Sequence, residues 1–299
     1  MTSLNLNLLQ VFHLAAELSS FTRAAAALHL TQPGISKHVR DLEEYYGTRL
    51  FDRLGKKVAL THAGEILYGT TKAVFDLLGE TRLKIDDLEG LAAGKLTVAA
   101  TITVGTYILP GLLADFTHVH PKIELAVDMA LSEQVAEKVL DNSAEIGLIG
   151  HSMKDPRLVS EKFLSDELLL IVSSRHKWAH RRRITPGELS DQPFIISKEG
   201  SGTRITVEKK FRDSGIALRR VIEFGNTEGV KKAVESNLGI SILSKHTVSR
   251  EIAVGLIIPL TLPGIDMERS FHFIYRRDKY ITQAMKSFLA LLKEREANR

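Results

Sequence analysis

The 299-residue sequence contains no cysteine, which excludes disulfide bonds, thiolate metal ligands and a cysteine nucleophile. It also lacks any apolar run near the roughly 18 residues that span a bilayer, so no membrane partner is expected. Residues 1–10 carry no lysine or arginine, which argues against a secretory leader. These absences predict a cytoplasmic protein whose structure depends on packing.

The sequence also has only a small excess of positive over negative charge. Lysine and arginine number 40 against 36 acidic residues, and the net charge of +4 identifies no polyanionic partner unless it is clustered. The length exceeds that of one usual domain, and 44% hydrophobic residues allow sizeable cores. We therefore expect a multi-domain chain of two or three folded units.

Three closely spaced helical patterns and a hairpin occupy residues 1–61. An apolar pattern from residue 8 to 18 is followed by an alanine-rich helix over about 22–28. Thr31 can cap a third helix, and Pro33 suits its first turn. The stripe of this helix that we expect to face inward consists of Ile35, Val39, Leu42 and Tyr46. Gly47 suits the helix end, and 49–60 has a hairpin pattern with Gly55 at its tip.

A long, proline-free helix is predicted over 62–89. Its apolar and threonine positions alternate by four and three residues, at Leu67, Thr71, Val74, Leu78, Thr81, Ile85 and Leu88. Such a seam favours a two-helix coiled coil, so we interpret 62–90 as a linker that joins two subunits into a homodimer. The alternative is an amphipathic helix that lies on its own domain, and the two threonines keep this alternative open.

Strand and helix patterns alternate from residue 94 to the end. Strands are predicted at 95–101, 123–129, 145–150, 168–172, 194–196, 221–224, 240–243 and 271–275. Helices lie between them, two of which begin near Thr203 and Thr227, and a last helix covers 283–296. This pattern predicts a doubly wound α/β sheet in two lobes, with ligands bound beyond the carboxyl ends of the strands.

Several motifs between residues 19 and 64 together resemble LysR-type transcriptional regulators. They are Ser19-Ser20-Phe21-Thr22-Arg23-Ala24-Ala25, Leu30-Thr31-Gln32-Pro33-Gly34-Ile35-Ser36, Leu42-Glu43-Glu44, Leu50-Phe51-Asp52-Arg53 and Leu60-Thr61-His62-Ala63-Gly64. The resemblance implies a ligand-responsive bacterial DNA-binding regulator that forms dimers or homotetramers. It also implies a winged helix-turn-helix joined by a linker helix to a two-lobed effector domain like type 2 periplasmic binding proteins.

The predicted domains follow from these patterns and the resemblance. The winged helix-turn-helix covers 1–61, the linker helix 62–90 and the effector-binding domain 94–299. Within the last domain we place lobe 1 at about 94–162 and 267–299, and lobe 2 at about 163–266.

The outer face of the third helix is the candidate surface for double-stranded DNA. Recognition helices use short polar groups near their start for base edges and cations for phosphates. By the resemblance, the contacts are Thr22, Thr31, Gln32, Pro33, Ser36, Lys37, Arg40 and Arg53. The chain departs from the family pattern at Gly34, where alanine is common, and at Lys37, where arginine is common. Lysine lacks the guanidinium fork, which puts a bidentate guanine contact from this position in doubt.

A glycine-rich turn in lobe 2, over 199–204, opens a helix and favours a small anionic effector. Helix N–H groups, two glycines, two hydroxyls and the Arg204 guanidinium supply the attraction. The family places the effector between the lobes, so further candidates follow two other strands. The complete set is Thr101, Ile102, Thr103, Ser201, Gly202, Thr203, Arg204, Asn226 and Thr227. The alternative is that Ser201 or Thr203 only caps the helix while Arg204 is solvated.

No catalytic constellation or metal site is expected. His176 and His180 lie four apart but lack the intervening glutamate of the zinc protease motif, and no nucleophile elbow or dinucleotide fingerprint occurs. We therefore expect no cofactor beyond a small-molecule effector and no enzyme activity. The rival interpretation, a solute-binding protein or small-molecule enzyme that uses the α/β domain, leaves 1–61 unexplained.

Overall fold

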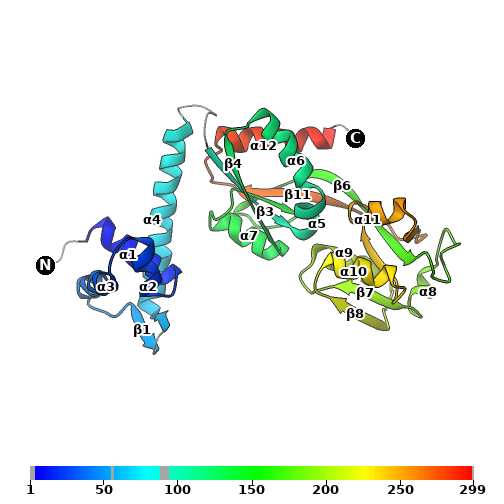
Figure 1. Ribbon diagram of the computed structural model, residues 1–299, viewed down its shortest axis with the longest axis horizontal. Helices are drawn as coiled ribbons and strands as arrows, with labels where there is room; N and C mark the ends of the chain where they lie inside the picture. Colours follow the sequence, from blue (N-terminus) through cyan, green and yellow to red (C-terminus); the bar gives the residue numbers. More distant parts are fainter. Residues whose placement is uncertain (1–3, 55–56, 88–93, 298–299) are drawn as a thin grey trace. The chain divides into compact units, whose positions relative to one another are not determined.

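A computed structural model describes residues 4–54, 57–87 and 94–297 (Figure 1). The chain forms two compact units, Met1–Ile85 and Asp86–Arg299. Within the described ranges, no helix combines the length and apolar character that crossing a membrane requires.

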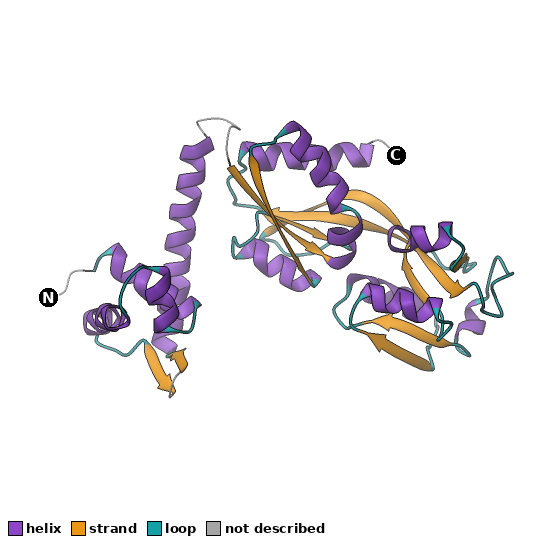
Figure 2. Ribbon diagram, in the orientation of Figure 1, coloured by secondary structure: helices purple, strands orange, loops and turns teal. Residues whose placement is uncertain are grey.

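The first unit contains helices around an apolar core, a hairpin and a long helix (Figure 2). Its elements are α1 (Leu6–Glu17), α2 (Phe21–Ala27), α3 (Gln32–Tyr46), β1 (Phe51–Leu54), β2 (Lys57–Leu60) and α4 (His62–Asp87). The antiparallel pairing of β1 with β2 confirms the predicted hairpin. Its predicted tip at Gly55, and the predicted continuation of the linker over 88–90, lie outside the described residues.

Both ends of α3 follow from its local sequence. The Thr31 hydroxyl accepts a hydrogen bond from the backbone N–H of Gly34 at 3.2 Å, which confirms the predicted cap. At the other end Gly47 has a φ of 65°, a left-handed conformation that costs glycine little. The prediction that Tyr46 faces inward is wrong. Tyr46 is 42% exposed because it is the last residue of α3, where Gly47 ends the helix, and its ring meets edge to face the ring of Tyr45, which is also exposed.

The predicted seam of α4 divides into two halves. Leu67 is buried and Thr71 is completely buried, and the Thr71 hydroxyl lies 3.1 Å from Nδ1 of His13 in α1. Leu78 and Ile85, further along the helix, are 46% and 59% exposed. The first half therefore packs on its own unit, as the alternative interpretation had it, while the second half leaves apolar side chains exposed.

Lobe 1 of the second unit is a sheet with helices on both faces (Figure 1). Its elements are β3 (Gly94–Thr101), α5 (Ile102–Tyr107), α6 (Leu109–Val119), β4 (Ile123–Ala130), α7 (Ser132–Leu140), β5 (Ile146–Ile149), the first part of β6 (Leu158–Ser173), β11 (Glu268–Arg276) and α12 (Gln283–Ala297). The strand order is β4-β3-β5-β11-β6, with β3, β4 and β5 parallel. Val98 packs toward α6 and α12 while its neighbour Ala99 packs toward α7, as strand alternation requires.

Lobe 2 repeats this layering. Its elements are the last part of β6, α8 (Pro186–Leu189), β7 (Pro193–Ser197), α9 (Gly202–Asp213), β8 (Arg220–Phe224), α10 (Thr227–Glu235), β9 (Ser241–Ser244), α11 (Lys245–Ala253) and β10 (Ile257–Leu260). Strands β7 and β8 are parallel, and β6 pairs with both β9 and β10. Phe194 packs toward α9 and its neighbour Ile195 toward α10 and α11. Two layered lobes confirm the predicted α/β fold.

The chain passes between the lobes inside β6 and β11. Strand β6 pairs with β11 up to Glu167 and with β9 from Leu168 onward. At this crossing Asp166 and Arg269 are register partners, and Nε of Arg269 lies 2.6 Å from Oδ2 of Asp166 with both side chains buried. A buried ion pair thus lies at the junction. The predicted lobe limits near 162 and 267 stay predictions.

Candidate functional site

The predicted DNA contacts on α2 and α3 lie at the surface. Thr22, Thr31, Gln32, Pro33, Lys37 and Arg40 are exposed, and Ser36 is half-buried. Nε2 of Gln32 donates a hydrogen bond to the Ser36 hydroxyl at 3.0 Å, one turn along the helix. Because buried Ile35 and Val39 fix the opposite face, these polar groups remain available to a partner. Arg53 lies in β1 opposite Val58, and its side chain lies outside the described ones.

The hairpin is fixed to α3 by a carboxylate and a close approach. Oε1 of Glu43 accepts hydrogen bonds from the backbone N–H groups of Leu50 at 2.8 Å and Phe51 at 3.3 Å. At the base, the Thr61 hydroxyl donates to the carbonyl of Arg49 at 2.7 Å. A Cβ on Gly64 would come within 2.1 Å of the Leu50 carbonyl oxygen, so only glycine fits there. The motif residues therefore set the position of the hairpin beside α3.

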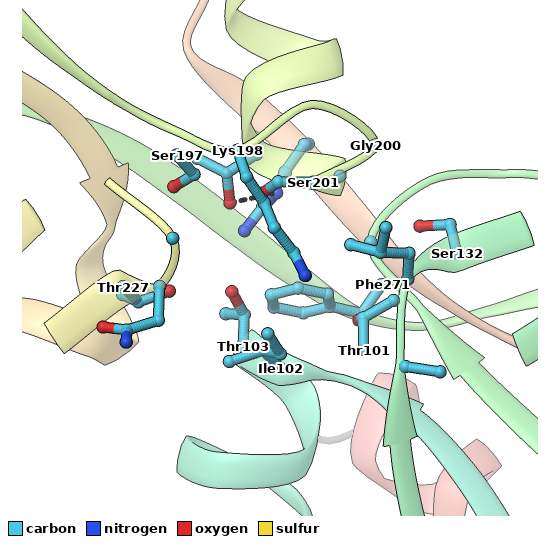
Figure 3. Close-up of a pocket in the computed structure, with 18 residues that line it drawn as sticks. Thr101, Ile102, Thr103, Ser132, Ser197, Lys198, Gly200, Ser201, Thr227 and Phe271 are labelled. Atoms are coloured by element: carbon cyan, nitrogen blue, oxygen red, sulfur yellow. Dashed lines mark hydrogen bonds between the residues drawn. The ribbon is translucent and has the colours of Figure 1, made fainter. Parts of the chain in front are cut away.

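A narrow cleft lies between the two lobes of the second unit, at the carboxyl ends of their parallel strands (Figure 3). The volume of the cleft is about 30 Å³, so a small ligand is favoured. The lobe 1 wall includes Thr101, Ile102, Thr103, Ser132, Arg269 and Phe271. The lobe 2 wall includes Ser197, Lys198, Gly200, Ser201, Gly202, Thr203, Asn226 and Thr227. Figure 3 shows Lys198 extending from lobe 2 toward Phe271.

All but one of the predicted effector residues lie on this cleft. Those that line it are Thr101, Ile102, Thr103, Ser201, Gly202, Thr203, Asn226 and Thr227. The structure does not bring Arg204 to the cleft. Its Nε lies 2.7 Å from Glu208 and its Nη1 lies 2.6 Å from Glu223, so two carboxylates hold the guanidinium. Arg204 is therefore neither a cleft residue nor simply solvated.

Sequence reasoning missed four polar residues of the cleft: Ser132, Ser197, Lys198 and Arg269. The Arg269 side chain is 5% exposed, and its Nη1 donates to the Thr203 hydroxyl at 3.2 Å. Burial lowers the pKa of Arg269, and the charge of Asp166 opposes that shift. Among the described residues, Nη2 of Arg269 and the Ser132 hydroxyl are buried without a hydrogen-bond partner. No local motif marks Arg269, because only the pairing of β11 with β6 places it here.

Three helices of nine or more residues begin at the cleft, namely α7, α9 and α10. The Asn226 side chain caps α10 by accepting from the backbone N–H of Gly229 at 2.8 Å. At α9 the Ser201 side chain stands at the cap position but makes no capping hydrogen bond. At α7 the Gln134 side chain accepts from the backbone N–H of Leu131 at 3.2 Å, and the side chain of Leu131 itself offers no acceptor to the first turn. Helix N-termini carry partial positive charge, and the described lining holds no acidic side chain. The site therefore favours a small anion.

A second polar contact joins the lobes beside the cleft. The Tyr107 hydroxyl of α5 donates to Glu228 of α10. Nζ of Lys231 lies 2.8 Å from Oε1 of both Glu228 and Glu251, and 5.3 Å above the Tyr107 ring. Burial, followed by the bond to Glu228, raises the pKa of Tyr107 to about 12. The phenol consequently stays protonated and donates across the lobes.

Of the two histidines that lie four residues apart in the sequence, His176 packs against Trp178. Nδ1 of His176 accepts a hydrogen bond from the backbone N–H of Trp178 at 3.2 Å, and the two rings pack edge to face. Within the part of the chain that the structure describes, no group of three or more histidine, aspartate or glutamate residues is placed to hold a metal ion.

Family models match both units. The model described as the bacterial regulatory helix-turn-helix protein of the lysR family matches residues 6–65, and the LysR substrate binding domain matches 89–297. This chain belongs to the LysR family of transcriptional regulators. The rival interpretation, in which the α/β unit acts as a solute-binding protein or an enzyme, does not account for the first match.

Other LysR-type proteins resemble this chain over most of its length. The RuBisCO operon transcriptional regulator of Acidithiobacillus ferrooxidans is 35% identical over 287 residues, 96% of this chain and 93% of that protein. The regulatory domain of Synechocystis CcmR in complex with 2-PG is 28% identical with a TM-score of 0.64, covering 69% of this chain and 98% of that one. A full-length OxyR from Pseudomonas aeruginosa has a TM-score of 0.75 at 21% identity, covering 98% and 94%, and shows the shared fold.

Proposed function

We propose that this LysR-type regulator binds a partly palindromic promoter site as a dimer or tetramer and senses a small anionic metabolite between its lobes. The observation that carries the effector proposal is the polarity of the cleft. Two cationic side chains meet there with the N-termini of α7 and α9, of which α9 has no capping side chain, and no acidic side chain is found in the described lining.

The effector would be held by the donors that lack partners in the free protein. A buried donor without an acceptor costs roughly 1–3 kcal/mol, so an anion that accepts from Arg269 Nη2 and the Ser132 hydroxyl removes two such penalties. Lys198 extends into the cleft from lobe 2 and supplies a positive charge that would attract an anionic effector (Figure 3). Because these donors belong to different lobes, the ligand binds best when the lobes stand at one particular angle.

DNA binding follows from the exposed face of α3. Gln32, Ser36 and Lys37 lie near the start of the helix, where side chains of a recognition helix reach base edges. The exposed apolar half of α4, with Leu78 and Ile85, supplies a surface for pairing two subunits. Two recognition helices related by a twofold axis suit a partly palindromic site.

The link between the two functions is a shift in population. A ligand that binds one lobe angle more tightly stabilises that state by the difference in its affinities. The altered lobe angle would change the geometry of the assembled subunits and thereby the bending of the bound DNA. Identical footprints with and without the effector would contradict this coupling.

Calorimetry on the full chain tests the effector proposal. The titrants are 2-PG and a panel of carboxylate, phosphate, neutral and cationic metabolites, and we expect anions alone to bind. For a binding anion, Lys198→Ala should weaken affinity about tenfold, which is about 1.4 kcal/mol. Arg204→Ala is the matched control and should leave affinity within about twofold, because its guanidinium lies outside the cleft. Binding of only neutral or cationic metabolites, or a loss confined to Arg204→Ala, contradicts the proposal.

Gel-shift titration tests the DNA surface. The DNA is a promoter fragment on which the unaltered protein gives a footprint. Lys37→Ala should weaken binding to it and reduce the slope of log K against log salt concentration by about one. Lys95→Ala is a control, because it removes another exposed cation, one that lies in the second unit. Unchanged affinity of Lys37→Ala at fixed salt would refute the assigned role.

A further inference from the structure

A second cavity lies between the lobes along α9. It shares only Gly150 and Arg269 with the effector cleft, and its volume is about 450 Å³. On lobe 1 it is bounded by His151, which follows β5, and by His272 of β11. On lobe 2 it is bounded by the middle of α9, including Lys209. The cavity is therefore larger than the cleft, and most of its lining residues are different.

Cations outnumber acids on the wall of this cavity. Arg269, Lys209 and Lys210 line it, against Asp213 as the acidic side chain of the described lining. Lys210 is held by the backbone carbonyl of Asp266 at 2.5 Å, and Arg269 by Asp166. Lys209 is exposed, and the described residues offer it no acidic partner. An unneutralised positive charge therefore faces the cavity.

Buried nitrogen atoms without partners gather at the same place. Nη2 of Arg269 and Nδ1 of both His151 and His272 are buried, and none has a hydrogen-bond partner among the described residues. All three residues line this one cavity. Burial is the main cause that lowers the pKa of His151 and of His272, so both rings are mostly neutral at pH 7 and each has one N–H to donate. Unpartnered nitrogen atoms from three residues of the lobe 1 wall indicate a missing anion or its water substitute.

We propose that this cavity is a second anion-binding site that takes a compact phosphate group, held by Lys209 and Arg269 with His151 and His272 as neutral donors. A phosphate has enough oxygen atoms to meet donors that converge from both lobes. The site is separate from the effector cleft, and its existence does not depend on the identity of the effector.

The shared arginine couples the two cavities. Arg269 donates from Nη1 to the Thr203 hydroxyl on the wall of the effector cleft, while its Nη2 is buried without a partner among the described residues, and the residue lines both cavities. An anion that draws on this guanidinium changes the cleft, and thermodynamic linkage makes the effect reciprocal. Because the walls belong to different lobes, occupation of the second cavity also depends on the lobe angle.

Nuclear magnetic resonance of the histidine rings in the full chain tests the proposal. Inorganic phosphate is titrated at constant pH and constant ionic strength, and His151→Gln and His272→Gln assign the two ring signals. We expect both signals to shift and saturate together. Lys209→Ala should weaken phosphate binding about tenfold, while Lys198→Ala should leave it within about twofold, because Lys198 lines only the effector cleft.

Several outcomes would overturn the second site. Shifts that grow linearly without saturation indicate an adventitious ion only. Equal affinity in Lys209→Ala and the unaltered chain removes the proposed cation. Loss of binding in Lys198→Ala but not in Lys209→Ala assigns phosphate to the effector cleft instead. Lys209 is exposed, so its replacement should not disturb folding. Failure of this test leaves the calorimetric test of the cleft unaffected, since that test depends on Lys198.

Discussion

The candidate DNA contacts on α3 come from ten consecutive positions, 31–40, whereas the effector cleft gathers side chains spread from Thr101 to Phe271. The helix face is fixed by an apolar core beneath it and a cap at its start. The cleft is fixed by buried polar contacts at the lobe junction. A substitution on α3 should therefore change the stability of that helix alone, while a substitution at the lobe junction should change the stability of both lobes.

The largest expected effect comes from the buried ion pair at the crossing. Asp166→Ala leaves the Arg269 guanidinium buried without its counter-charge, and such losses cost about 3–5 kcal/mol. The free energy of unfolding of the second unit should fall by that amount. Urea denaturation followed by fluorescence reports on this unit, because its Trp178 is the one tryptophan in the sequence.

A surface ion pair provides the matched control for that change. Asp128→Ala removes a carboxylate that pairs with Lys138 at 2.7 Å but is 53% exposed, so the expected loss is below about 1 kcal/mol. Equal losses in Asp128→Ala and Asp166→Ala would mean that the lobe junction contributes nothing special to stability.

A smaller effect is expected from the hydrogen bond between the lobes. Tyr107→Phe removes the donor to Glu228 while Lys231 keeps its carboxylate partners, which should cost about 1–2 kcal/mol. The lobe angle should also vary more widely. Since the chain has no cysteine, spin labels on Glu133→Cys in lobe 1 and Arg212→Cys in lobe 2 measure the distance between the lobes cleanly. An unchanged distance distribution would show that this contact does not restrain the lobes.

The cap of α3 should contribute less. Thr31→Ala deletes the acceptor for the Gly34 N–H, which typically costs about 1 kcal/mol. Hydrogen exchange of the first amides of α3 measures the loss, and the second unit should not respond. Thr22→Ala is the control, because Thr22 is exposed and caps nothing. If both variants destabilise α3 equally, the cap is not what stabilises the helix start.

The smallest effect concerns Gly34. Alanine in a helix is favoured over glycine by roughly 0.5–1 kcal/mol, but a Cβ here would lie 3.3 Å from the Thr31 hydroxyl oxygen. We expect Gly34→Ala alone to gain less than about 0.5 kcal/mol by the same exchange measurement, and more when Thr31→Ala removes the crowding. Additive effects in the double variant would contradict that crowding.

Much of the fold could be predicted from the sequence because its signals are local. Capping, proline and glycine positions gave α3 its ends, and the apolar pattern gave most strands of both lobes. The first half of β6 was missed because its polar residues obscure the alternation, which only pairing with β11 accounts for. Helix α11 was missed because Ser244 both ends β9 and caps the helix, leaving no loop to mark the boundary.

In the candidate site too, some residues could be predicted from a local pattern and others could not. Residues such as Thr103 and Thr227 were predictable because each follows a strand and begins a helix, a pattern that is visible in the sequence. Arg204 looked equally suitable, but the direction of its side chain depends on Glu208 and Glu223. Glu223 lies in β8, outside the helix that carries Arg204. Lys198 also follows a strand, but it was overlooked beside the glycine-rich turn, whereas Arg269 lies inside β11 and carries no local signal.

The sequence by itself determined the helical first part and the α/β second part, the cap of α3 with its buried Ile35, Val39 and Leu42, and the strand ends at which a ligand could bind. These depend on interactions between residues close together in the chain. The tertiary structure alone decided which cations face the cleft, and that Arg269 lies between two cavities. Such placements depend on pairing between strands about a hundred residues apart, as with Asp166 and Arg269, which no local pattern encodes.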